Sequence, residues 1–146
     1  MRRVIRTPLT VALASLAAAG AAAGAVAAVA GATTTARPQK KSVSVNDNFY
    51  GPAKLTITKG STVTWKWPAD VGDSHDVKLT KKPSGAKFTF KSPDTGKKVT
   101  KGTFQSPPFA SGPAKFVVTG FNKPGRYHLI CTFHETEMQM DITVKK

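Results

Sequence analysis

Short runs of alternating apolar and polar residues dominate the chain after Ser42. The alternation is clearest at residues 43–45, 55–57 and 63–67, and it recurs at 75–79, 88–90, 115–119, 126–132 and 138–144. A period of two is typical of strands with one buried face, whereas no helical period follows Ser42. Gly51-Pro52 and Lys59-Gly60 predict turns between these strands. The pattern therefore predicts an all-β fold, a two-sheet β-sandwich of about seven to eight strands.

The first 32 residues have a different pattern, typical of an export signal. Arg2, Arg3 and Arg6 precede a stretch rich in Ala, Gly, Val and Leu, and Ala30-Gly31-Ala32 predicts cleavage before Thr33. The alternative is a retained membrane anchor, because residues 9–31 approach the roughly 20 residues that span a bilayer. We therefore expect an exported protein, periplasmic, cell-surface or secreted, which contacts a membrane only if this segment is retained.

The remainder of the chain predicts one domain. Residues 33–41 combine Thr, Pro and Lys without apolar periodicity, which indicates a flexible linker. Residues 42–146 then form the folded domain, a length that supports one hydrophobic core but not two. We expect this domain to be a monomer.

The charge of the chain is strongly positive. The formal net charge is +14, and residues 78–101 alone carry eight lysines against one acidic residue, Asp94. This segment predicts an elaborated hairpin whose lysines either protect a sheet edge or dock an anionic surface or an acidic partner. Nucleic acid is a poor candidate partner for an exported protein.

Cys131 is the only cysteine of the chain. In an oxidising compartment a lone thiol is either inert and buried or held by a metal. Its neighbours favour the metal, since His134 and Met138 lie within eight residues of it. Thiolate, imidazole and thioether are donors that suit copper better than calcium or magnesium.

A blue-copper centre needs one thiolate, two imidazoles and a weak axial thioether, so a second histidine is required. His128 precedes Cys131 by three residues in one strand, which turns it to the opposite face. His75 follows a turn-like stretch at 69–74 and is expected to begin a strand, where a rigid sheet can present it. The predicted metal ligands are therefore His75, Cys131, His134 and Met138, whereas Met140 shares its strand face with apolar residues and is expected to pack in the core.

With these features the chain resembles the cupredoxin family, near its plastocyanin, amicyanin and pseudoazurin branch. The matching segments are Asn48-Phe49-Tyr50, Pro52, the Gly60 turn, Val63-Thr64-Trp65, Ser74-His75-Asp76-Val77, Gly125-Arg126-Tyr127 and the Cys131, His134 and Met138 loop. The resemblance implies an eight-stranded Greek-key sandwich with one type 1 copper ion at the four predicted ligands. It also implies that Asp76 ties the His75 segment to the cysteine loop.

The function expected from this resemblance is that of a one-electron carrier outside the cytoplasm and not of an enzyme. The chain holds only three histidines, too few for the additional copper sites of multicopper enzymes. The alternative is a copper storage or delivery protein that uses the same ligands without passing electrons.

Redox partner proteins are expected to dock transiently near His134, because this histidine lies in a connecting loop. An apolar rim around it is expected from Phe49, Tyr50, Pro68 and Phe133.

Overall fold

The computed structural model describes residues 36–146, so the predicted signal peptide or anchor at 1–32 lies outside the described residues. All regular secondary structure within 36–146 is β-strand. The strands are β1 (Lys40–Asn46), β2 (Phe49–Gly51), β3 (Lys54–Thr58), β4 (Thr62–Trp67), β5 (Asp70–His75), β6 (Lys78–Lys81), β7 (Phe88–Lys91), β8 (Lys98–Lys101), β9 (Phe109–Ser111), β10 (Ala114–Thr119), β11 (Gly125–Ile130) and β12 (Gln139–Lys145). Within this range no helix has the length and hydrophobicity to cross a bilayer.

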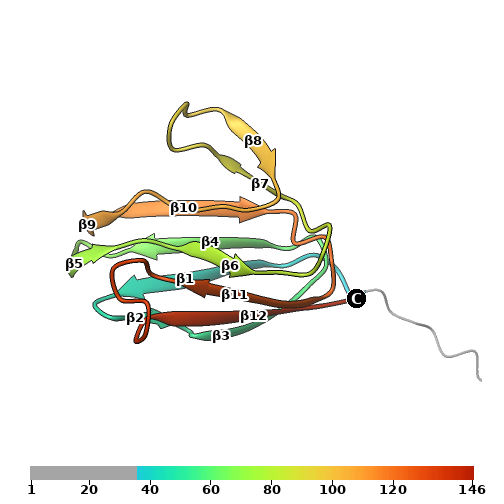
Figure 1. The fold of residues 1–146 in the computed structure, drawn as a ribbon, viewed down its shortest axis with the longest axis horizontal. Coiled ribbons are helices and arrows are strands. Elements are labelled where there is room, and N and C mark those ends of the chain that lie inside the picture. Colours follow the sequence, from blue (N-terminus) through green and yellow to red (C-terminus); the bar gives the residue numbers. More distant parts are fainter. Residues whose placement is uncertain (1–35) are drawn as a thin grey trace, which may run out of the picture. The chain divides into compact units, whose positions relative to one another are not determined.

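Two main sheets form the sandwich predicted from the sequence (Figure 1). One has the strand order β2-β1-β4-β10-β7-β8 and the other the order β3-β12-β11-β6, while β5 and β9 form a short two-stranded ribbon. The strand count exceeds the expected seven to eight. Strands of three residues, such as β2 and β9, are too short to carry a recognisable alternation, so the sequence pattern missed them.

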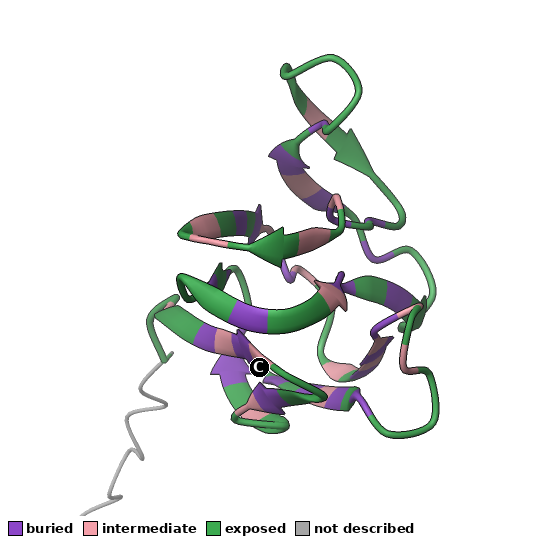
Figure 2. Ribbon diagram, turned by 90° about the vertical axis from the view of Figure 1, so that its left-hand side faces the viewer, coloured by how far each residue is buried: buried purple, intermediate pink, exposed green. Residues whose placement is uncertain are grey.

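The core lies between the inner faces of the two sheets. Buried and exposed bands alternate along the strands (Figure 2), as a period of two requires. Trp65 and Trp67 of β4 are both buried, and Phe88 lies edge-on to Phe104 and Phe121 at centroid distances of 5.0 and 5.4 Å. Each buried aromatic side chain contributes roughly 1.5–3 kcal/mol to folding, so this cluster is a large part of the core energy.

Ordered pairing begins inside the segment that the sequence assigned to a linker. Lys40 and Lys41 of β1 pair in parallel with β4, and the backbone N–H of Gln39 donates to Ser61 Oγ at 2.8 Å. Both lysines are exposed, so their side chains give no pattern of burial. The backbone pairing with β4 therefore starts the domain two residues before Ser42.

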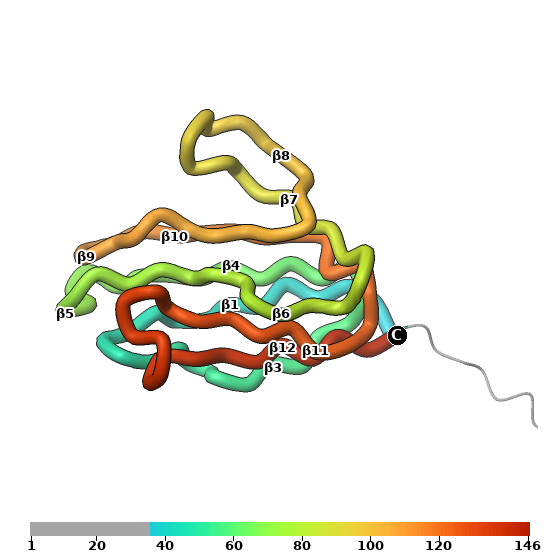
Figure 3. Tube along the Cα trace, viewed as in Figure 1, coloured from blue at the N-terminus to red at the C-terminus, as the bar shows by residue number. Residues whose placement is uncertain are grey.

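The lysine-rich segment forms the expected hairpin. β7 and β8 pair antiparallel at the end of the six-stranded sheet, and β8 is its edge strand. In Figure 3 the hairpin rises away from the rest of the sandwich. The preceding β6 pairs instead with β11 in the other sheet.

The predicted turn at 69–74 is wrong, since these residues belong mostly to strand β5. His75 ends β5, and the expected strand at 75–79 is replaced by β5, two intervening residues and β6. β5 pairs with β9 at Asp70–Ser111 and His75–Phe109. Asp70, Gly72 and Asp73 are exposed, which removed the apolar alternation that would have predicted a strand.

Candidate metal centre

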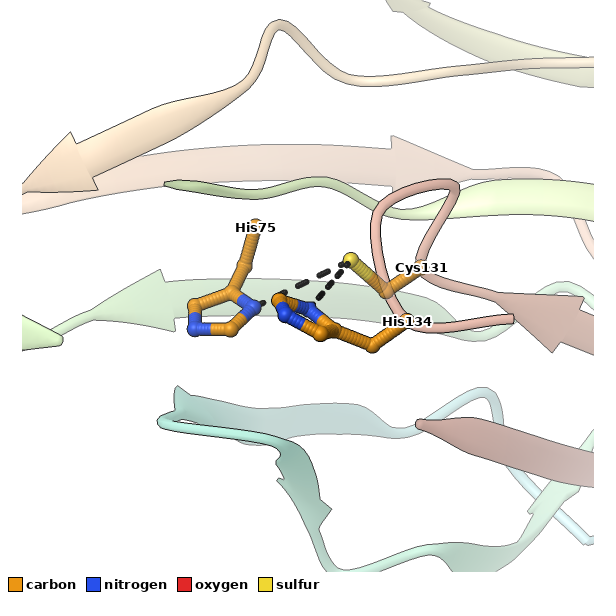
Figure 4. A group of neighbouring side chains, drawn as sticks. All are labelled: His75, Cys131 and His134. Carbon is orange, nitrogen blue, oxygen red and sulfur yellow. Dashed lines mark hydrogen bonds between the residues drawn. The ribbon is translucent and has the colours of Figure 1, made fainter. Parts of the chain in front are cut away.

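Three predicted ligands meet at one end of the sandwich (Figure 4). His75 Nδ1 lies 3.8 Å and His134 Nδ1 lies 3.9 Å from Cys131 Sγ. The three donor atoms lie within 4.8 Å of one another. Folding therefore brings the imidazole at the end of β5 to the thiol that follows β11, which was the central geometric prediction from the sequence.

The His75 ring is held by its other nitrogen. Nε2 lies 3.1 Å from the backbone oxygen of Val71 and 3.4 Å from Asp47 Oδ1, and the imidazole is fully buried. With the proton on Nε2 donated to the Val71 carbonyl, the lone pair of Nδ1 points toward Cys131. Trp67 Nε1 also donates to the backbone oxygen of His75 at 3.1 Å, which fixes the strand end.

The loop between β11 and β12 closes on itself through its backbone. The N–H of Cys131 donates to the oxygen of Met138 at 3.0 Å, and the N–H of Met138 donates to the oxygen of His134 at 2.8 Å. The N–H of His134 also donates to the oxygen of Cys131 at 3.3 Å. These short-range bonds hold His134 beside the thiol within the loop.

The spacing of the donor atoms fits a transition metal. Bonds of about 2.0 Å to imidazole nitrogen and about 2.3 Å to thiolate sulfur, the values known for zinc, separate nitrogen and sulfur by about 3.7 Å in a trigonal plane. The observed separations are 3.8 and 3.9 Å. Burial raises the pKa of the Cys131 thiol, while hydrogen bonds from surrounding backbone groups partly oppose this rise. A buried thiol with two adjacent imidazoles suits a soft metal ion such as copper.

Comparison with known proteins identifies the family. Residues 39–145 match the model of copper-binding proteins of the plastocyanin/azurin family. The chain belongs to this family. The family and the donor set together identify copper as the cofactor of this cupredoxin. No curated protein matches the chain.

Solved structures share the cupredoxin fold. A purple cupredoxin from Nitrosopumilus maritimus matches with a TM-score of 0.50 and 23% identity, over 72% of this chain and 99% of its own. A copper-containing nitrite reductase from Thermus scotoductus SA-01 matches with a TM-score of 0.53 and 24% identity, over 76% of this chain and 23% of the enzyme. An amicyanin mutant in its Cu(I) form matches with a TM-score of 0.51 and 18% identity, over 73% of this chain and 82% of its own.

Asp76 joins the two segments that carry the predicted ligands of this cupredoxin. Its buried carboxylate accepts hydrogen bonds from the backbone N–H of Thr132 at 2.7 Å and from the Thr132 hydroxyl at 2.9 Å. Gln105 Nε2 donates to the same carboxylate at 2.7 Å. The sequence suggested Asp76 but missed Gln105 and Thr132, since neither stands in a pattern that separates it from other surface polar residues.

The predicted apolar rim is wrong for Tyr50. This side chain is 2% exposed, and its hydroxyl donates to the backbone oxygen of Asp76 at 2.6 Å. Burial is the main cause that raises the pKa of its phenol. Phe49 and Phe133 are instead 54% and 53% exposed, and Pro68 is also exposed.

The remaining predicted residues also have defined places. Met138 is fully buried directly before β12, and its side chain stays the predicted axial donor. Met140 is buried on β12 opposite Leu129, as expected for core packing. His128 is bound to Asp141 Oδ1 at 3.0 Å and lies outside the cluster, as strand alternation predicted.

Proposed function

We propose that this cupredoxin carries single electrons outside the cytoplasm, with one copper ion held by His75, Cys131, His134 and Met138. Copper, when bound, supplies a centre that alternates between Cu(I) and Cu(II). The observation that carries the proposal is the fixed position of the ligand-bearing segments. Asp76 ties the His75 segment to the Cys131 loop, and Val71 orients the His75 ring. Ligands that stay in place in both oxidation states favour fast electron transfer.

The difference in exposure between the two histidines supports a route for the electron. His75 is fully buried, whereas His134 is partly exposed in the loop after β11. The exposed side chains of Phe49 and Phe133 supply apolar surface for a transient contact. A redox partner protein would dock near His134 and exchange its electron through that imidazole.

The composition of the chain supports a carrier in preference to an enzyme. Only three histidines occur in the sequence, and the His128 side chain is bound to Asp141. Two histidines and one cysteine provide for one copper centre. The arginines and the apolar stretch of the first 32 residues support export, and a single buried cysteine is consistent with an oxidising compartment.

Reconstitution with Cu(II) tests the proposal. The full chain is loaded with copper and measured by visible absorption, electron paramagnetic resonance and voltammetry, beside Cys131→Ser and the matched control His128→Gln. We expect an intense thiolate-to-copper charge-transfer band in the wild type and in His128→Gln, its loss in Cys131→Ser, and a reversible voltammetric wave.

Two other results would contradict the proposal in different ways. A colourless wild type that binds only zinc would end the assignment of a type 1 copper site. A coloured protein without a reversible wave would retain the copper site and favour storage or delivery over electron transfer.

A further inference from the structure

Four lysines on the outer face of the six-stranded sheet form two directly opposed pairs. Lys66 of β4 faces Lys115 of β10, and Lys91 of β7 faces Lys98 of β8. All four side chains are exposed. Like charges directly opposite each other on neighbouring strands destabilise a sheet. Within residues 36–146 the two ion pairs present involve histidines, so none of these four lysines forms an ion pair with a carboxylate.

Protection of the sheet edge explains only part of this arrangement. β8 is an edge strand, where a lysine such as Lys98 discourages pairing with other chains. β4 and β10 are interior strands, with neighbours on both sides in the sheet order. The opposed pair of Lys66 and Lys115 therefore requires a different explanation, and an anionic ligand supplies one.

A groove of about 630 Å³ lies where the β7–β8 hairpin leaves β10. Three of the four lysines line it, Lys91, Lys98 and Lys115, together with apolar residues that include Phe109 and Val117. No aspartate or glutamate is among its lining residues. Lys115 also lines a neighbouring hollow of about 580 Å³ with Lys66, so the four lysines share one surface. The charge of this surface is complementary to an acidic ligand.

The groove also borders a stretch of open strand edge. β7 pairs with β10 only at Phe90–Val118 and Thr89–Thr119. Residues 115–117 of β10 pair with β4 on one side, and within the described range no strand pairs with them on the other. An open strand edge accepts an extended peptide by strand addition, in which backbone hydrogen bonds supply affinity and alternate side chains supply specificity.

We propose that this groove binds an extended acidic segment of a partner protein, which adds as a strand beside β10. Carboxylates on one face of the segment meet Lys91, Lys98 and Lys115, and apolar side chains on its other face turn toward Phe109 and Phe116, which also line the groove. Phe109 also pairs with His75 between β9 and β5, so the groove ends beside a predicted copper ligand. The inference goes beyond electron transfer and does not require copper to be bound.

The test uses a fluorescein-labelled ten-residue peptide of alternating glutamate and valine. A glutamine–valine peptide of equal length serves as the uncharged control. Fluorescence anisotropy follows binding to the full chain, metal-free and copper-loaded, at low and at physiological salt. We expect the glutamate peptide to bind both forms. The double variant Lys91→Gln/Lys115→Gln should weaken binding roughly fivefold to tenfold, because it removes two exposed charge pairs.

The matched control removes the same charge elsewhere. Lys54 and Lys145 lie on β3 and β12 of the other sheet, and both are exposed. Lys54→Gln/Lys145→Gln should leave binding within about twofold of the wild type. Bound peptide should also slow hydrogen exchange of amides among residues 115–117, because strand addition pairs their backbone groups.

Four results would overturn the proposal. They are an absence of peptide binding, an equal loss of binding in both double variants, equal binding of the glutamine peptide, and unchanged hydrogen exchange on β10.

Binding to vesicles of phosphatidylglycerol tests the alternative ligand, an anionic membrane. If they bind with the same lysine dependence and the peptide does not, the surface contacts a membrane and not a partner protein. Because metal-free protein is measured too, failure here is separate from failure of the copper proposal.

Discussion

Asp76 and Thr132 form a double hydrogen bond between the two segments of the protein that carry the predicted copper ligands. The Thr132 N–H and hydroxyl donate to the Asp76 carboxylate at 2.7 and 2.9 Å, across a sequence separation of 56 residues. Asp76 directly follows His75, and Thr132 directly follows Cys131. This contact therefore links the segment of the buried imidazole to the segment of the thiol.

Removal of the Asp76 carboxylate should weaken this link. Asp76→Ala leaves the partly buried N–H of Thr132 without its charged acceptor, whereas the exposed amide of Gln105 can bind water instead. We expect a cost of about 1–3 kcal/mol of unfolding free energy. Asp76→Asn keeps one carbonyl acceptor and should lose less. Urea unfolding of the metal-free protein measures both values, and equal stability of the alanine variant and the wild type would contradict the role of this link.

The two buried methionines should behave differently when copper is present. Leucine conserves the volume of methionine, so Met138→Leu and Met140→Leu should each change stability by less than about 1.5 kcal/mol. Only Met138→Leu should raise the reduction potential, because it removes the predicted axial thioether. Voltammetry of the copper-loaded variants measures this difference. If the reduction potential shifts in Met140→Leu alone, the axial thioether belongs to Met140 and not to Met138.

Gly112 should not tolerate a side chain. A Cβ at this position would lie 2.0 Å from the oxygen of Pro68 and 2.5 Å from that of Trp67, both of which are backbone atoms. Gly112→Ala should therefore cost about 1–3 kcal/mol and displace β9 from β5, the strand that ends at His75.

Gly102→Ala is the matched control for this substitution. Its Cβ would meet only the oxygen of Ala86, at an ordinary 3.8 Å. Thermal unfolding compares the two variants, and equal transition temperatures would show that the backbone around Gly112 can move aside.

Reversal of the charge at Lys115 should stabilise the fold while it harms peptide binding. Lys115→Glu converts the repulsion with Lys66 into attraction, which should add about 0.2–1 kcal/mol of unfolding free energy. The same change at Lys54, whose register partner is Asp141, should lower stability instead. Urea unfolding at low salt measures the direction of the stability change in each variant. A loss of stability in Lys115→Glu would contradict the proposed strain between the opposed lysines.

The copper loop illustrates what local sequence can predict. Cys131, His134 and Met138 lie close in the chain, and short backbone hydrogen bonds close the loop around them. Strand alternation also placed His128 on the other face from the thiol. Such inferences succeed because a strand has a fixed side-chain period, so spacing alone determines which residues share a face.

Strand β5 and Tyr50 illustrate where local sequence failed. The polar residues of β5 resembled a turn, yet pairing with β9 makes the segment a strand that ends at His75. Tyr50 was expected at the surface, yet its hydroxyl is buried against the backbone of Asp76. In both cases the decisive partner lies more than 20 residues away, at a position that no local pattern encodes.

The sequence by itself determined the all-β pattern, the excess of lysine and the donor types of the copper loop. Only the tertiary structure brought His75 within 3.8 Å of Cys131 Sγ, joined Asp76 to Thr132 and set Lys66 opposite Lys115. The physical reason is that alternation fixes the face of a residue but not its neighbour on the next strand. Register and sheet order select that neighbour, and both depend on the packing of the whole core.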